Sequence, residues 1–292
     1  MSFHKILCPI DFSPGSDQAL RIAARLAKES SAELVIVHAW HIPPIAFGSE
    51  FTFPTDVIQQ LIDDANAGLE QAKGRMRELG ITHVSSKLLT GVPWNEIVEL
   101  AASDGAFDLI VIGTHGRTGL ARILLGSVAE KVVRHAPCPV LAVRLDSQPR
   151  ELRHILCPTD FSESSHHAVR LAGELAQSTG ASITLLHVLE LPVAYSGEPH
   201  PPELYREIDV RSTELLQKWA AALRRESGAQ VTTKVRLGWP GAETLAMLDE
   251  DSSYDLVVMG SHGRTGIKRA LLGSVAEKTV RHARCPVLVA RR

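Results

Sequence analysis

The sequence predicts an α/β protein of two tandem domains, each a doubly wound, five-stranded parallel sheet. Two observations lead to this fold class: short apolar, β-branched runs alternate with segments of helical periodicity, and the whole pattern occurs twice. The segment ILCPIDFS at Ile6–Ser13 returns as ILCPTDFS at Ile155–Ser162. The run LLGSVAEKVVRHAPCPVL from Leu124 returns from Leu271 with few changes.

Each copy has the length of a domain, whereas solenoid repeats span only about 20–50 residues. We therefore expect a first domain over residues 1–146 and a second over 151–292, joined near LDSQPREL. In the first copy, strands are expected at 5–10, 33–39, 83–89, 108–113 and 139–143. Helices are expected after Pro14, over 55–79, from Trp94 and over 127–134.

The fourth strand of each copy indicates a sheet that is covered on both faces. LIVIG and LVVMG are apolar at consecutive positions, as in parallel sheets with helices on each side. Ligands of such sheets bind at the carboxyl ends of the strands, where the strand order reverses. If the first and fourth strands flank that point, Asp11 and Gly113 lie at its mouth, and Asp160 and Gly260 do so in the second copy.

Composition and charge exclude several classes of protein. The chain has 292 residues, 45% apolar and 22% charged, and a net charge of −2. Neither half has the positive excess that nucleic-acid binding requires. No apolar run approaches the roughly 20 residues of a membrane span, and the N-terminus lacks the pattern of a signal peptide. We expect a cytoplasmic protein that binds neither nucleic acid nor membrane.

The four cysteines occupy matching places in the two copies, each beside a proline in an apolar run. Cys8 matches Cys157, and Cys138 matches Cys285. The sequence has no C-x-x-C spacing and no nearby pair of histidines, so a metal site is disfavoured. We expect four small apolar core residues.

A glycine-rich loop follows the fourth strand of each copy, GTHGRTGLARILLGS from Gly113 and GSHGRTGIKRALLGS from Gly260. Each loop ends where a helix is expected to begin, at Ser127 or Ser274. The start of a helix presents unpaired N–H groups and a positive dipole end, which together suit a phosphate. The alternative is a tight structural crossover in which these serines are plain helix N-caps. The loop contains neither G-x-G-x-x-G nor G-x-x-x-x-G-K-[ST].

These loops and their context resemble the universal stress protein family, whose ATP-binding members share the motif G-x2-G-x9-G-[ST] and a Rossmann-like fold. The resemblance extends over nearly all of both copies, including the P-x-D-F-S start. The motif is matched at these positions: Gly113, Gly116, Gly126, Ser127, Gly260, Gly263, Gly273 and Ser274.

The resemblance implies one ATP site in each copy. The glycines and Ser127 or Ser274 would hold the phosphates, and Asp11 or Asp160 would face the ribose. The backbone at Ala39 or Val188 would meet adenine. A carboxylate near phosphates is repelled unless a cation intervenes, so Mg²⁺ near Asp11 and Asp160 is plausible. The alternative for Asp11 is to cap the helix that follows Pro14.

Other residues near these loops have ordinary structural interpretations. His115 and His262 lie within the loops, but no nucleophile or second base accompanies them, so a loop-stabilising or solvent-facing role is favoured. Structural roles are also favoured for His38 and His187 at the ends of apolar strands. The proline-rich segments HIPPIAFGSEFTFP and ELPVAYSGEPHPPE are interpreted as lids or partner surfaces. The final strands, PVLAV and PVLVA, invite pairing of the two halves as a pseudo-dimer, or of two chains as a homodimer.

We therefore expect a tandem universal stress protein that binds ATP in both halves and acts as a signalling module with an unknown protein partner. It is not expected to be an efficient enzyme, because neither a two-carboxylate metal site nor an arginine finger is evident. The alternatives are a slow ATP hydrolase and an interaction scaffold without nucleotide.

Overall fold

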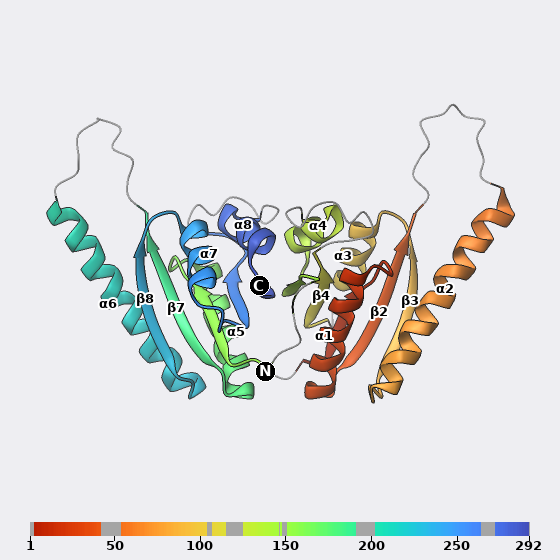
Figure 1. Cartoon of the computed structure of the whole chain (residues 1–292), viewed down its shortest axis with the longest axis horizontal. Coiled ribbons are helices and arrows are strands. Elements are labelled where there is room, and N and C mark those ends of the chain that lie inside the picture. The colour runs from red at the N-terminus through yellow and green to blue at the C-terminus, as the bar shows by residue number, and fades with distance from the viewer. Residues whose placement is uncertain are drawn as a thin grey trace, which may run out of the picture. The chain divides into compact units, whose positions relative to one another are not determined.

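A computed structural model gives the fold of the chain (Figure 1). It describes residues 3–41, 54–103, 107–114, 125–145, 147, 151–190, 202–263 and 272–291. The contacts divide the chain into two compact units, Ser2–Leu145 and Asp146–Arg292, called here the N-terminal and the C-terminal unit. Each unit is a parallel sheet with helices packed on it.

The N-terminal unit alternates strands and helices throughout its described part. Its elements are β1 (Lys5–Pro9), α1 (Pro14–Ser30), β2 (Glu33–Trp40), α2 (Thr55–Glu78), β3 (Val84–Thr90), α3 (Pro93–Ser103), β4 (Leu109–Gly113), α4 (Ser127–His135) and β5 (Val140–Val143). The strand order is β3-β2-β1-β4-β5, with every neighbouring pair parallel.

The C-terminal unit repeats this arrangement. Its elements are β6 (His154–Pro158), α5 (Glu163–Thr179), β7 (Ser182–Leu189), α6 (Pro202–Ser227), β8 (Val231–Leu237), α7 (Pro240–Glu250), β9 (Leu256–Gly260), α8 (Ser274–His282) and β10 (Val287–Ala290). The order is β8-β7-β6-β9-β10, again all parallel. The predicted fold class is confirmed.

The strand order places the first and fourth strands of each unit side by side. Ile6 pairs with Leu109 in the N-terminal unit, and Ile155 pairs with Leu256 in the C-terminal unit. The chain runs from this pair to one side through β2 and β3, and to the other side through β5. The point where the order reverses therefore lies between β1 and β4, or between β6 and β9, where ligands of such sheets bind.

The strands of each unit differ in how far they are buried. Side chains of the central strands, such as Ile6, Ile36 and Ile110, have no exposed area. The outer strands β3 and β8 are rich in Ser, Thr and Lys and are only partly buried. The final strands β5 and β10 are buried along their whole length, so partial burial is a feature of β3 and β8.

The cysteines lie in the core, as predicted. All four are free and buried. Burial raises the pKa of Cys157 and of Cys285 to about 12, and it raises the pKa of Cys8 as well. These thiols are therefore protonated at neutral pH and are poor nucleophiles or metal ligands.

Candidate functional site

The last residue of the fourth strand in each unit must be glycine because a helix begins against it. An ideal Cβ on Gly113 would lie 2.8 Å from the backbone oxygen of Gly15, in the first turn of α1. A Cβ on Gly260 would lie 2.6 Å from Oγ of Ser164, in the first turn of α5. Both distances are shorter than real Cβ contacts, so the approach of helix and strand excludes any side chain there.

The two ends of each glycine loop are joined by a backbone hydrogen bond. Gly126 donates its N–H to the oxygen of Thr114 at 2.8 Å, and Gly273 donates to the oxygen of Ser261 at 2.8 Å. Thr114 and Ser261 are themselves buried. The start of α4 or α8 is thereby fixed beside the carboxyl end of β4 or β9.

The helices that follow the loops begin at Ser127 and Ser274, and their N-caps are Gly126 and Gly273. The interpretation of the two serines as plain N-caps is therefore wrong, because each stands at the first helical position. Among the residues that the structure describes, no side chain caps either helix. The N–H groups of the first turn thus have no capping side chain to accept their hydrogen bonds, an arrangement that suits an anion.

In the C-terminal unit the glycine loop meets the predicted ribose-binding aspartate. An ideal Cβ on Gly263 would lie 2.9 Å from Oδ2 of Asp160. Gly273 also lies close to Gly263. An ideal Cβ on Gly273 would be 3.8 Å from the N atom of Gly263. The structure therefore brings together residues that are more than 100 positions apart in the sequence.

The aspartates occupy a turn that leads from the first strand into the first helix. Asp11 Oδ1 accepts hydrogen bonds from the N–H of Ser13 at 3.1 Å and from its hydroxyl at 2.5 Å. Asp160 Oδ1 accepts from the N–H of Ser162 at 3.0 Å. The helix N-caps are Ser13 and Ser162, so the capping role considered for Asp11 is wrong.

A phenylalanine follows each aspartate in a left-handed backbone conformation. Phe12 has a φ of 62° and Phe161 a φ of 64°, which is rare for a residue with a bulky side chain. Each ring packs on a buried histidine, His38 or His187, with ring centroids 4.6 and 4.4 Å apart.

The two histidines have the structural role that the sequence favours. Their Nδ1 atoms lie 2.7 and 2.8 Å from the backbone oxygens of Ile10 and Thr159 at the ends of the first strands. The sequence analysis missed the role of the phenylalanines, although their recurrence within D-F-S was a signal.

The remaining predicted residues have the following places. Ala39 and Val188 stand near the carboxyl ends of β2 and β7, opposite Leu89 and Arg236 of the neighbouring strands. These strands adjoin β1 and β6, so Ala39, Asp11 and Gly113 follow one another along the carboxyl edge of the N-terminal sheet. Gly116 and the loop residues His115, Arg117 and Arg264 lie outside the described residues.

His262 in the second loop is held at its backbone and at its ring. Its N–H donates to Oγ of Ser164 at 3.3 Å, and its Nδ1 lies 2.8 Å from Oγ of Ser261. Its Nε2 is buried and has no hydrogen-bond partner among the residues that the structure describes. Burial and, to a smaller extent, the positive charge of Arg291 lower the pKa of His262 below its ordinary value.

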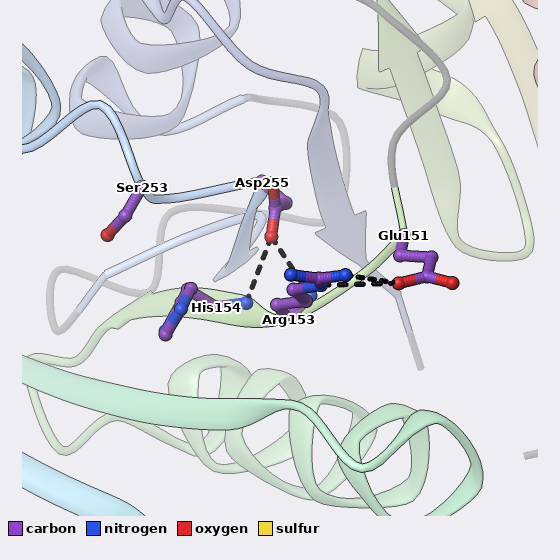
Figure 2. A pocket seen from close by; sticks show the side chains of 5 residues that line it. All are labelled: Glu151, Arg153, His154, Ser253 and Asp255. Atoms are coloured by element: carbon purple, nitrogen blue, oxygen red, sulfur yellow. Dashed lines mark hydrogen bonds and ion pairs between the residues drawn. The ribbon is translucent and has the colours of Figure 1, made fainter.

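A pocket lies at the opposite end of the C-terminal sheet, lined by Glu151, Arg153, His154, Ser253 and Asp255 (Figure 2). Asp255 Oδ2 accepts from the N–H groups of Arg153 and His154 at 2.9 and 3.1 Å. Asp108 makes the same two bonds in the N-terminal unit, to His4 and Lys5. The aspartates therefore join the amino ends of neighbouring strands, and we assign this pocket a structural origin.

The described residues contain no group of three His, Cys, Asp or Glu side chains that could hold a metal ion. A Mg²⁺ ion fits the carboxyl edge only as an ion held by one carboxylate, Asp11 or Asp160, and by phosphate oxygens, which is a common mode for Mg²⁺. Within the described helices, none is long and apolar enough to cross a membrane.

Comparison with known proteins gives one consistent result. A model described as "Universal stress protein family" matches residues 2–144 and 151–291. A universal stress protein of Methanocaldococcus jannaschii is 41% identical over 143 residues, covering 49% of this chain and 82% of the relative. One from Mycobacterium tuberculosis strain H37Rv is 30% identical over 305 residues, covering 99% of this chain and 97% of the relative. The crystal structure of a universal stress protein from Archaeoglobus fulgidus has a TM-score of 0.73 and 23% identity, covering 99% and 98% of the chains.

Proposed function

The chain belongs to the universal stress protein family, which matches it once in each half, and from this premise we propose that each half binds ATP at the carboxyl ends of its strands. The observation that carries the proposal is the contact of Gly263 with Asp160, where a Cβ would lie 2.9 Å from Oδ2. ATP needs a site for its phosphates next to a site for its ribose. Gly263 belongs to the proposed phosphate site and Asp160 to the proposed ribose site.

The phosphates are assigned to the glycine loop and the first turn of the next helix. Gly273 donates its own N–H to the oxygen of Ser261 and lies close to Gly263, so the N–H groups proposed to meet a phosphate are those of the first turn of α8 beside it. The helix has no capping side chain from the described part of the chain, and Ser274 adds a hydroxyl at the first position. Backbone N–H groups and a helix dipole together favour an anion here. Gly126 and Ser127 have the same roles in the N-terminal unit.

The ribose is assigned to Asp11 and Asp160, and adenine to the backbone near Ala39 and Val188. In each aspartate the turn engages Oδ1. In Asp160 the other oxygen, Oδ2, points toward the glycine loop. A carboxylate so placed can accept hydrogen bonds from ribose hydroxyls or contact Mg²⁺ that the phosphates bring. The protein is proposed to act by binding, with occupancy sensed by a partner protein in the cytoplasm.

The first experiment is to count nucleotide in the purified protein. Protein prepared without added nucleotide is denatured, and the released material is separated by chromatography and quantified per chain. If little is released, MgATP binding is measured by calorimetry. Two adenine nucleotides per chain are expected. A protein that releases none and binds none overturns the proposal.

Substitutions in the loops assign the two sites. Gly126→Val should abolish binding in the N-terminal unit and leave one site per chain, because the side chain enters the space where the backbone meets phosphate. Gly273→Val should do the same in the C-terminal unit. Ser127→Ala should weaken the N-terminal site by about 1.5–3 kcal/mol, the value of a hydrogen bond to a charged group. A stoichiometry of two in either glycine variant contradicts the assignment of that loop.

We also propose that the final strands, Val140–Val143 and Val287–Ala290, pair the two halves as a pseudo-dimer. Halves expressed separately should then associate in size-exclusion chromatography. Two halves that elute independently at all concentrations would contradict this.

A further inference from the structure

The two units differ at the residue that packs against the end of the fourth strand. The first helix begins PGSDQALRIA in the N-terminal unit and ESSHHAVRLA in the C-terminal unit. The second residue of this helix is Gly15 in one and Ser164 in the other. Both face the glycine at the start of the loop, Gly113 or Gly260. The C-terminal unit therefore has a hydroxyl at a place where the N-terminal unit has no side chain.

The hydroxyl of Ser164 is bonded to the second glycine loop. Its Oγ accepts the N–H of His262 at 3.3 Å, and it is half-buried between the helix and the loop. The contact links α5 to a residue 98 positions away. Gly15 cannot form the equivalent bond, because it has no side-chain hydroxyl.

His262 is consequently fixed from three directions. Ser164 binds its N–H, Ser261 binds its ring at Nδ1, and the next residue, Gly263, stands against Asp160. The remaining ring nitrogen, Nε2, is buried without a hydrogen-bond partner among the described residues. A buried polar atom of this kind costs free energy, and a ligand or ordered water normally satisfies it.

We propose that Ser164 is a positioning residue that holds the first residues of the second glycine loop, Ser261–Gly263, in place for the ligand, so that the C-terminal unit binds nucleotide more tightly than the N-terminal unit. This inference rests on the proposed function. A loop that is already held loses less conformational entropy when the ligand binds. The smaller entropic cost gives a higher affinity. Gly15, at the matching position of the N-terminal unit, has no hydroxyl that could give this support.

The test exchanges the two residues in the full-length protein. MgATP binding to the C-terminal unit is measured by calorimetry in a Gly126→Val background, and binding to the N-terminal unit in a Gly273→Val background. Ser164→Ala should weaken the C-terminal site by about 2- to 10-fold, the effect of one neutral hydrogen bond. Gly15→Ser should strengthen the N-terminal site, and Gly15→Ala, which adds the Cβ without the hydroxyl, should not.

Amide hydrogen exchange in the absence of nucleotide gives a readout independent of binding. Exchange in residues 260–263 should be faster in Ser164→Ala than in the wild-type protein, with no change in residues 84–90 of the other unit. Equal affinities of the two sites, or unchanged affinity and exchange in Ser164→Ala, would overturn the inference while leaving the proposed function intact. A wild-type protein that binds no nucleotide at either site would overturn both.

Discussion

At the scale of single residues, the turn after the first strand directs the aspartate toward the loop. Ser13 or Ser162 caps the helix and also bonds the aspartate through Oδ1, while the intervening phenylalanine adopts a positive φ. A residue in that conformation is held there by its surroundings. Here the ring packs on a buried histidine, which is anchored to the end of the first strand. The orientation of the carboxylate is thus set by packing.

His262 gives the stability of the protein a predictable pH dependence. Its pKa is lowered in the folded state, mainly by burial and secondarily by Arg291. Below a pH of about 6.5, the ordinary value for histidine, the unfolded chain therefore binds more protons at this residue than the folded chain. The contribution of His262 to stability is present above that pH and is lost as the pH falls.

The measurement compares denaturant unfolding of the wild type and His262→Gln at pH 7.5 and 5.5. The wild type should lose more stability than the variant between the two values. An equal loss in both proteins would show that His262 titrates as it does in the unfolded chain.

Residue-level detail shows how far the sequence could predict the site. The pairing of Asp160 with the glycine loop could be predicted only on the condition that the first and fourth strands are neighbours, which the structure shows them to be. The bond from His262 to Ser164 could not be predicted, since it depends on how closely α5 approaches the end of β9, where no room is left for a Cβ. Likewise, Asp11 and Ser13 are both favoured capping residues, and only geometry shows that Ser13 is the cap.

At the scale of elements, the packing of α5 on the end of β9 leaves no room for a side chain. Gly260→Ala should destabilise the protein by about 1–3 kcal/mol, because the new methyl group would overlap backbone atoms of Ser164. Gly74→Ala is the matched control. It lies within α2, its ideal Cβ has no atom within 4 Å, and the change should stabilise the protein by about 0.5–1 kcal/mol.

Denaturant midpoints of the two variants test this pair of expectations. Destabilisation by both changes would indicate that alanine is disfavoured for some reason other than space. A neutral Gly260→Ala would show that the helix can shift away from the strand.

The order of elements could be predicted because both signals were strong, namely apolar periodicity and its repetition. The boundaries of two helices differ slightly from the predicted ones. Helix α3 begins at Pro93 rather than Trp94, and α4 ends at His135 rather than at residue 134. Proline is favoured in the first turn of a helix, where its missing N–H is not needed. The order of strands within the sheet could not be predicted, because β-branched residues favour strands without specifying neighbours.

At the scale of the whole molecule, nucleotide should stabilise each unit separately, because each unit is proposed to have its own site. In the wild-type protein, each unit should gain roughly 2.7 kcal/mol when free MgATP is about a hundred times the dissociation constant of its own site. In Gly126→Val only the C-terminal unit should be protected, so its melting transition alone should move. Calorimetric melting with and without MgATP tests this, and protection of both units in the variant would contradict independent sites.

The hydrogen bond that joins the ends of each glycine loop has a consequence for how the chain has diverged since its duplication. With Gly126 bonded to Thr114 and Gly273 bonded to Ser261, the fold requires only that the two ends meet. The cost of closing such a loop changes slowly with its length, so folding alone would tolerate insertions between them. The proline-rich segments after β2 and β7 have indeed drifted apart in sequence. The nine residues between the second and third glycines of the motif have the same number in both copies, as expected if the proposed ligand, rather than folding, sets the length of the loop.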